Sequence, residues 1–299
     1  MTIHGGGLKQ TSLTKLHLIV VLALKQAVKN KIISYNVAND VVLPPKLYSE
    51  KRILSKEEQK KLVELALTNE HPLAFAVFLG LYTGLRIGEL LGLKISDINF
   101  DKKVIHVKRT VGRVSIPGTK KSEYIVSDPK TAKGRRDIPM PDFLGDLIKG
   151  YIVKTEDLRR ILKYDIVECT PEKEKWINED YLFSSYWGKP YDVSPFRNLL
   201  TKLLKEAGIG HITVHALRHS FATRAIENGF DIRSLADILG HTDVKMTLNT
   251  YGHALEEQKK LNMEKLSAQY ENESGNVYNS EASTVKITVI KGGKLIELG

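Results

Sequence analysis

The sequence predicts a mainly α-helical fold that carries one small antiparallel β-sheet. Apolar residues recur at helical spacing over residues 12–35 and again through most of the chain after Asp142. Between these stretches, residues 104–111, 124–127 and 135–139 are short and rich in β-branched side chains, which is typical of strands. We therefore expect an α+β protein in which helices surround a minor sheet.

Size, composition and charge narrow the class of protein. The 299 residues are 42% hydrophobic and 27% charged, an ordinary globular composition that excludes a wholly disordered chain. The single cysteine, Cys169, cannot form an internal disulfide, which favours a reducing, cytoplasmic location. The longest apolar stretch, Leu16–Leu24, is too short to cross a bilayer, so we expect no membrane segment. A formal net charge of +10 suggests a polyanionic partner.

The first hundred residues divide into one helix, a linker and two further helices. Residues 36–52 are the predicted linker, because a pair of prolines within them cannot continue a helix. Ser55 followed by Glu58 matches a capping box, which predicts a helix from there to Thr68. The strongly apolar stretch 73–91 then predicts one long buried helix.

The chain after the predicted sheet is helical up to a tail of different character. Gly240 is expected to end one helix and Asp243 to cap the next. A polar stretch then leads into two short apolar segments around Gly292 and Gly293, which indicate a β-hairpin. The predicted helices span about residues 142–163, 193–207, 214–228, 231–239, 243–251 and 253–270, and the hairpin strands span 284–290 and 294–298.

Positive charge is concentrated in two blocks. Residues 1–52 contain eight basic and two acidic residues, and residues 102–136 contain eleven basic and two acidic residues. Two such blocks on a mildly acidic body indicate a surface that binds the phosphates of a nucleic acid. Lysine-rich loops that only keep a protein soluble would give the same pattern. The candidate DNA contacts in these blocks are Lys46, Lys51, Arg52, Lys108, Arg109, Lys120, Lys121, Lys133, Arg135 and Arg136.

Two segments in the first half place charged residues in informative settings. Arg86 lies among apolar and small residues, where its burial requires a partner. Glu89 is three residues away on the same predicted helical face, so an intrahelical ion pair is the alternative to a functional role. Residues 128–139 are predicted to form a turn between two strands, with Lys130 and Lys133 near its tip. Such a turn can present a lysine to a phosphate, although solvated lysine-rich turns are common.

Two further segments in the second half contain histidines. His215 and Arg218 are three residues apart and therefore project from one helical face. His215 and His219 also have the spacing of a two-histidine metal site, but the glutamate that a zinc peptidase needs after the first histidine is missing, so a metal site is the weaker interpretation. His241 follows a helix-ending glycine, and Tyr251 lies near the end of the next helix. Each of these two residues, taken alone, is typical of a structural position.

Together, these four segments resemble the tyrosine recombinases, the phage integrase family. The motifs occur in the family order over about residues 53–270, as TGLRIGELLGL, PKTAKGRRDIP, HALRHSFAT, LGH and a late tyrosine. The patterns HxLRHxxAT and LGHxxxxxTxxTY are highly specific in combination. The resemblance implies a mostly helical catalytic domain with a small β-sheet, preceded by a smaller helical domain, the two clamping duplex DNA.

The resemblance and the chemistry of the side chains together imply a role for each residue. Tyr251 is the nucleophile, which attacks a DNA phosphodiester and leaves a 3′-phosphotyrosine and a free 5′-hydroxyl. His215 is the candidate base, and Lys130 on the turn is the candidate acid for the departing oxygen. Forked, permanently charged guanidinium groups suit the non-bridging oxygens. The candidate catalytic residues are therefore Arg86, Lys130, His215, Arg218, His241 and Tyr251, with Glu89 and His219 orienting them.

We expect no cofactor and no metal. The phosphotyrosine conserves the energy of the broken bond, so no ATP is required, and the cationic side chains take the place of a metal ion. Lys130 matches the family position better than Lys133 does. Lys130→Ala is therefore expected to impair cleavage strongly, and Lys133→Ala is expected mainly to weaken binding.

The resemblance also predicts the domain organisation and the partners. Residues 1–52 resemble the last helix and exit linker of a truncated DNA-binding domain, residues 53–270 form the catalytic domain, and residues 271–299 form a tail that docks on an adjacent subunit. The implied partners are a double-stranded recombination site, further copies in a homotetramer, and an accessory DNA-bending or excision factor. The predicted function is integration or excision of a mobile element. The alternatives are a decayed DNA-binding fragment and a host recombinase that resolves chromosome dimers.

Overall fold

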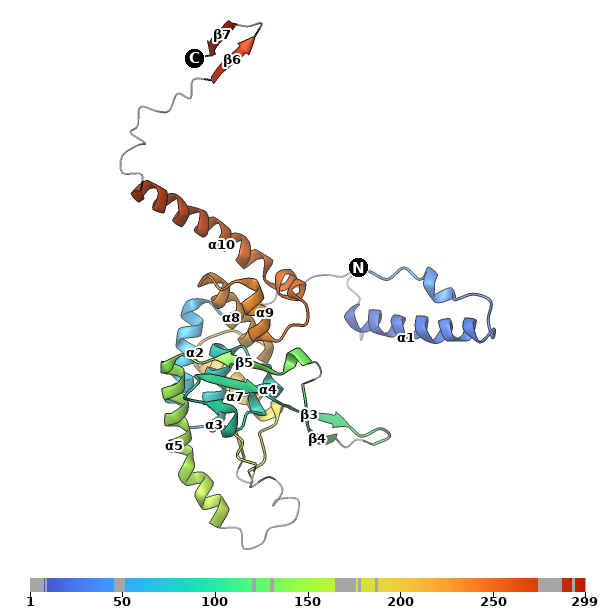
Figure 1. The fold of residues 1–299 in the computed structure, drawn as a ribbon. Helices are drawn as coiled ribbons and strands as arrows, with labels where there is room; N and C mark the ends of the chain where they lie inside the picture. The colour runs from blue at the N-terminus through green and yellow to red at the C-terminus, as the bar shows by residue number, and fades with distance from the viewer. Residues whose placement is uncertain are drawn as a thin grey trace. The chain divides into compact units, whose positions relative to one another are not determined.

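The computed structural model of the chain contains two compact units, residues 1–51 and residues 52–299 (Figure 1). The structure describes residue 8 and residues 10–45, 52–119, 122–129, 132–164, 176, 179–185, 188–273, 287–291 and 294–298. Among these described residues, no helix is both long and apolar enough to cross a membrane.

The first unit consists of helix α1 (Gln10–Lys29) and a short 3₁₀ turn, Val37–Asp40. The helix ends before the expected residue 35, because Lys31 takes a left-handed conformation with φ of 56°. The chain then folds back, and the side chain of Asn36 donates to the carbonyl of Val21 at 3.0 Å. The turn is thereby tied to the face of the helix that precedes it.

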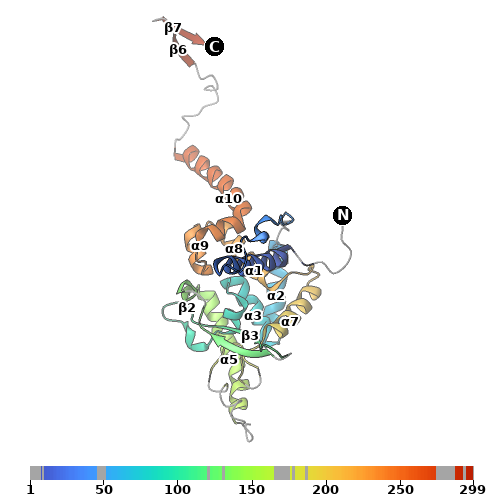
Figure 2. The ribbon, with the colours of Figure 1, turned by 90° about the vertical axis from the view of Figure 1, so that its right-hand side faces the viewer.

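The second unit is built around the buried helix α3 (Pro72–Thr83), which contacts α2 (Lys56–Thr68), α7 (Val193–Glu206) and α8 (Val214–Glu227). Nearly every residue of α3 is buried, so this helix forms the centre of the hydrophobic core. The predicted capping box starts α2, where the Ser55 hydroxyl accepts from the Glu58 amide at 3.1 Å. These helices appear from two directions in Figures 1 and 2.

The prediction of one continuous helix over residues 73–91 is wrong. α3 ends at Thr83, and Gly84 adopts a left-handed conformation with φ of 62°. A separate short helix, α4 (Ile87–Leu91), begins after Arg86, which is its N-cap residue. Both pieces are buried on all sides, so the apolar pattern contains no polar face to mark the break. The break places the Arg86 side chain at a helix start rather than within a helix.

The expected single sheet is divided into two. β1 (Ile98–Asn99), β2 (Val104–Val107) and β5 (Arg136–Pro139) form an antiparallel sheet in which Ile105 lies opposite Ile138. β3 (Thr110–Ser115) and β4 (Ser122–Ser127) pair only with each other in the described residues. Figure 1 shows this β3–β4 hairpin extending away from the helices. Short 3₁₀ turns cover Ile95–Asp97 and Ala132–Gly134.

This division corrects two expectations about the sheet region. Residues 104–111 are not one strand, because β2 and β3 belong to different sheets. The segment between β4 and β5, which contains Lys130 and Lys133, does not connect two paired strands, since β4 pairs with β3 and β5 pairs with β2. The insertion expected between Val111 and Asp128 does form a hairpin.

The remaining helices are α5 (Asp142–Tyr164), α9 (Ile232–Leu239) and α10 (Val244–Glu273). Gly240 ends α9 in the left-handed conformation, with φ of 63°, as its position predicts. α10 is interrupted at Tyr251, whose φ of −122° and ψ of 20° are not helical. The predicted tail hairpin is present as β6 (Ile287–Lys291) paired with β7 (Lys294–Leu298), although Gly292 and Gly293 lie outside the described residues.

Candidate active site

Two turns and the first half of α8 meet at one place in the second unit. The Arg218 side chain donates to the carbonyl of Gly84, between α3 and α4, at 2.9 Å. Its other terminal nitrogen donates to the carbonyl of Leu239 at 2.6 Å, and Arg86 donates to the carbonyl of Gly240 at 3.1 Å. The two predicted arginines, 132 residues apart in sequence, are therefore held by the same pair of turns.

Glu89 fixes Arg86 through a second layer of contacts. Its carboxylate accepts from the Arg86 side chain at 2.8 Å and from the Arg86 backbone amide at 3.0 Å. Arg136 donates to the same carboxylate at 2.8 and 3.2 Å. Burial acts to raise the pKa of Glu89, but the hydrogen bonds and charges of Arg136 and Arg86 outweigh it and hold the pKa below its ordinary value. Glu89 is therefore ionised and orients both guanidinium groups.

Arg218 is almost completely buried. Its burial, together with the nearby charges of Arg86 and Arg136, lowers its pKa to about 9. The group still carries its proton at neutral pH. A protonated guanidinium group that two backbone carbonyls hold in place is suited to bind a phosphate oxygen.

His241 is held by a residue that the sequence analysis left without a role. The Nδ1 atom of His241 lies 2.8 Å from the hydroxyl of Thr247, and both side chains are buried. Burial, and then the charges of Arg218 and Arg86, lower the pKa of His241 to about 4, so the ring is neutral at pH 7. When the Thr247 hydroxyl donates to Nδ1, the proton of the ring is on Nε2. That tautomer has an N–H available for a phosphate oxygen.

Tyr251 lies against the second histidine of the HALRH segment. Its hydroxyl is 2.8 Å from Nδ1 of His219, and both side chains are buried, with 6% and 8% of their surface exposed. Burial raises the pKa of Tyr251 to about 12, against the opposing effect of Arg218. His215 is more exposed, and its ring centroid is 5.2 Å from that of His219. The structure thus assigns the direct contact with the tyrosine to His219.

A pocket of about 260 Å³ opens beside these groups. Its walls include Arg86 and His241, and Pro129 and Gly134 border it from the segment between β4 and β5. Lys130 itself lies outside the described residues. Lys133 of the same segment donates to the carbonyl of Thr242 at 3.1 Å. The other lining residues are Glu89, Thr110, Gly240, Thr242 and Met246.

Five of the six candidate catalytic residues lie in the same part of the second unit, where the contacts and charges described above link them. They are Arg86, His215, Arg218, His241 and Tyr251. The sequence analysis missed Thr247, although it is the first threonine of the TxxTY pattern and so carried a signal. It also took Arg136 for a DNA contact. No sequence signal indicated the pairing of Arg136 with Glu89, because 47 residues separate them.

The other candidate DNA contacts are found in different settings. Arg52 pairs with Glu58 at 2.6 Å and Arg135 with Asp128 at 2.8 Å, while Lys108 and Arg109 both pair with the buried Asp97. Arg136 has only 6% of its side chain exposed, so it acts inside the site rather than on an open surface. Lys46, Lys51, Lys120 and Lys121 lie outside the described residues.

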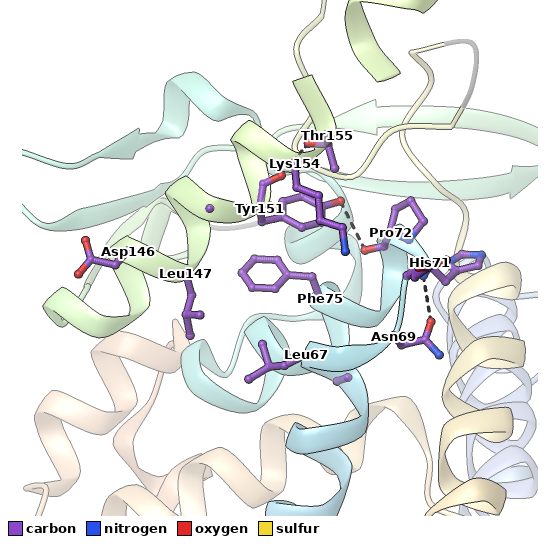
Figure 3. A pocket seen from close by; sticks show the side chains of 13 residues that line it. Leu67, Asn69, His71, Pro72, Phe75, Asp146, Leu147, Tyr151, Lys154 and Thr155 are labelled. Atoms are coloured by element: carbon purple, nitrogen blue, oxygen red, sulfur yellow. Dashed lines mark hydrogen bonds between the residues drawn. The ribbon is translucent and has the colours of Figure 1, made fainter. Parts of the chain in front are cut away.

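A second pocket of about 260 Å³ lies between α5 and the junction of α2 and α3 (Figure 3). The rings of Phe75 and Tyr151 stack there, with centroids 4.5 Å apart and planes inclined by 10°. The Tyr151 hydroxyl donates to the carbonyl of Pro72 at 3.4 Å. None of the candidate catalytic residues lines this pocket.

The described part of the chain contains no cluster of three or more histidine, cysteine or acidic residues that could hold a metal ion. The candidate site instead contains cations, one carboxylate that is shared between two arginines, and a buried tyrosine that does not itself line the pocket. This composition is suited to an anionic ligand attacked by a phenol.

Sequence comparison places the chain in a family. The sequence model of the phage integrase family matches residues 52–258, which include every residue of the site described above. The chain belongs to the phage integrase family.

Individual relatives agree with this assignment. The chain is 33% identical over 225 residues to the tyrosine recombinase XerC-like protein of Caldanaerobacter subterraneus subsp. tengcongensis, a match that covers 74% of this chain and 55% of the relative. It is 28% identical over 228 residues to the transposase from transposon Tn916 of Enterococcus faecalis, covering 72% of this chain and 52% of the relative. The chain therefore spans about half the length of the curated relatives it matches.

A solved structure confirms the fold class. The Tn1549 transposon integrase, in complex with transposon right end DNA, superimposes with a TM-score of 0.68 at 26% identity, and the match covers 87% of this chain and 81% of that one. The mainly helical fold with small antiparallel sheets is thus the fold of an integrase, as the sequence predicts.

Proposed function

We propose that this chain cleaves and rejoins double-stranded DNA as a tyrosine site-specific recombinase that integrates or excises a mobile element. One observation carries the proposal: two arginines, a neutral histidine and a buried tyrosine are gathered in one region. Arg86 and His241 line a pocket there, and Arg218 lies close enough to both His241 and Tyr251 for its charge to lower their pKa values. The similarity to the Tn916 transposase and the Tn1549 integrase supports a mobile element as the source of the DNA.

The proposed reaction gives each of these groups a role. Tyr251 attacks the phosphorus, the bond to the 5′-oxygen breaks, and a 3′-phosphotyrosine remains. Arg86, Arg218 and Nε2–H of His241 donate to the non-bridging oxygens, where negative charge increases in the transition state. Lys130 is assigned to protonate the departing oxygen, and Pro129 and Gly134 on either side of it border the pocket. His215 is the base assigned from the sequence.

Rejoining is the reverse of this step with a new strand. The 5′-hydroxyl of the second DNA attacks the phosphotyrosine, and the tyrosine leaves with the proton that it lost. Strand exchange requires that both strands of two duplexes are cut, and each tyrosine cuts one strand. A homotetramer on synapsed DNA is therefore part of the proposal. Docking of residues 271–299 on an adjacent subunit, and an accessory bending or excision factor, complete it.

The test is capture of the covalent intermediate. Duplexes from the DNA that flanks the coding region are nicked a few nucleotides downstream of candidate cleavage positions. Cleavage then releases a short fragment that carries the free 5′-hydroxyl. This fragment diffuses away, so the covalent adduct accumulates. We expect protein-linked DNA that survives denaturation in detergent and is removed by protease. Tyr251→Phe is expected to bind the same DNA in a mobility-shift assay and to form no adduct.

Two results would contradict the proposal. One is an adduct that persists in Tyr251→Phe, which would assign the nucleophile to another residue. The other is the absence of any adduct from the unaltered protein on DNA that it binds specifically, which would favour a DNA-binding protein without strand-cleaving activity.

A further inference from the structure

The contact between Tyr251 and His219 is the feature of the site that the proposed function does not yet use. The Tyr251 hydroxyl and the Nδ1 atom of His219 are 2.8 Å apart, and the hydroxyl donates to Nδ1 when the proton of the neutral ring is on Nε2. The two rings are inclined by 60°, with centroids 5.7 Å apart, which places the edge of the imidazole at the hydroxyl. His219 therefore touches the oxygen that attacks the phosphorus.

The backbone on both sides fixes this contact. His219 lies in the second turn of α8, a helix buried over most of its length. Tyr251 interrupts α10 with a non-helical φ of −122°, and Gly252 follows directly. The helix is therefore interrupted at the residue whose hydroxyl meets α8, and α8 contacts both α9 and α10.

Burial makes an acceptor at this oxygen necessary. With 6% of Tyr251 exposed, little water reaches the hydroxyl, so the proton must pass to a protein group or remain in place. Burial also raises the pKa of Tyr251 to about 12, which increases the cost of losing the proton unassisted. The Nδ1 atom of His219 is already at hydrogen-bonding distance, the geometry that a general base requires.

We propose that His219 is a catalytic residue whose Nδ1 atom holds the Tyr251 hydroxyl and accepts its proton as the oxygen attacks the phosphorus. The O–H bond breaks as the O–P bond forms, and the imidazole becomes an imidazolium. The 5′-oxygen leaves with a proton from the acid assigned to Lys130. On rejoining, His219 returns its proton to the departing phenol oxygen. The inference rests on the proposed recombinase function and assigns the base of that reaction.

His215 then has a different task. Its ring stands 5.2 Å from that of His219, centroid to centroid, on the preceding turn of α8, and it is more exposed than His219. It belongs to the same helical face as Arg218. This position suits a hydrogen bond to the phosphate of bound DNA.

The test changes the acidity of the nucleophile in three proteins. Tyr251 is replaced by 3,5-difluorotyrosine, whose phenol is more acidic, through nonsense suppression. The replacement is made in the unaltered protein, in His219→Asn and in His215→Asn. An asparagine oxygen can still accept from the phenol but cannot take its proton. Covalent adduct formation is then timed on the nicked duplex that captures the intermediate.

The expected result is specific to His219. His219→Asn should cleave at least about 100-fold more slowly than the unaltered protein, the usual effect of removing a general base. Difluorotyrosine should restore at least about tenfold of that loss in His219→Asn, and it should change the rate of His215→Asn little. Because each ratio compares two phenols within one variant, any loss of stability common to both cancels.

The opposite pattern overturns the inference. Rescue in His215→Asn but not in His219→Asn would make His215 the base, and no rescue in either would make His219 a structural anchor of α10. If the unaltered protein forms no adduct at all, the proposed function fails instead, so the two failures are distinct. A second substitution, His219→Gln, repeats the test in case the asparagine variant does not fold.

Discussion

Both terminal nitrogens of Arg136 donate to the carboxylate of Glu89, at 2.8 and 3.2 Å, and its Nε atom donates to the carbonyl of Ile238 at 2.5 Å. One side chain at the start of β5 thus ties α4 to α9, the two elements that present Arg86 and His241. Arg136 therefore positions the residues of the site, and its removal should lower both the free energy of unfolding and the rate of cleavage.

Arg136→Ala should destabilise the protein by about 3 kcal/mol, because breaking one partner of a buried pair leaves a carboxylate without its full set of donors. The adjacent Arg135→Ala is the matched control, since Arg135 and Asp128 are both more than half exposed and such pairs contribute roughly 1 kcal/mol or less. Urea unfolding of the two variants measures the difference. Equal losses would mean that the buried pair contributes no more than the surface pair.

The pKa of Glu89 predicts how stability depends on pH. A carboxyl group whose pKa is lowered in the folded protein stabilises it above the unfolded pKa, and this contribution is lost as pH falls through the folded pKa. Glu89→Gln should therefore be less stable than the unaltered protein at neutral pH, and the gap should narrow as pH falls below about 4.3. Urea midpoints across this range measure the gap, with the exposed Glu64→Gln as control. A gap that stays constant with pH would contradict the assignment.

Thr247→Val should slow cleavage about tenfold, the effect of losing one neutral hydrogen bond of roughly 1.4 kcal/mol. Valine keeps the shape of the buried side chain but removes the hydroxyl that fixes His241. Thr247→Ser retains the hydroxyl and should cleave at close to the original rate. Adduct formation gives the rate, and a mobility-shift assay should show equal DNA affinity for both. A valine variant that cleaves normally would show that His241 needs no fixed tautomer.

Gly84→Ala should be more costly than the same change at Gly208. Both glycines have positive φ, 62° and 68°, so both variants bear a left-handed strain of about 1–2 kcal/mol. A Cβ atom at Gly84 would also lie 2.4 Å from the ring of Phe221, whereas nothing lies within 4 Å of a Cβ atom at Gly208. We expect an additional loss of about 1–3 kcal/mol for Gly84→Ala. Urea unfolding measures it, and equal losses would mean that Phe221 moves aside freely.

The sequence predicted the elements whose ends are set by neighbouring residues. Ser55 and Glu58 start α2 and Gly240 ends α9, because a cap depends on contacts within one turn. The break at Gly84 was missed because most residues of α3 and α4 are buried, so no continuous polar face marks where one helix ends and the next begins. The strand pairing was missed because β2 joins β5 across the whole β3–β4 hairpin, a choice that local alternation does not specify.

The candidate site shows the same division. Arg86, His215, Arg218, His241 and Tyr251 were identified from motifs, and the structure connects them through the contacts of one site. The partners were not identified, since Arg136 meets Glu89 across 47 residues and Tyr251 meets His219 across 32. Pairs of this kind depend on how α4, α8, α9 and α10 pack. A sequence motif therefore identifies the candidate reacting residues but not the residues that position them.

The crowding of positive charge around Glu89 has a thermodynamic consequence. Burial lowers the pKa of Arg218 most, the nearby charges of Arg86 and Arg136 lower it further, and the carboxylate of Glu89 opposes them only in part. Repulsion between these arginines therefore destabilises the folded protein when no ligand is bound. Under the proposed function, a phosphodiester that binds here relieves that repulsion in addition to making its own hydrogen bonds. The proposal therefore implies that folding and DNA binding are coupled, because the DNA backbone offsets the free-energy cost of bringing the cations together.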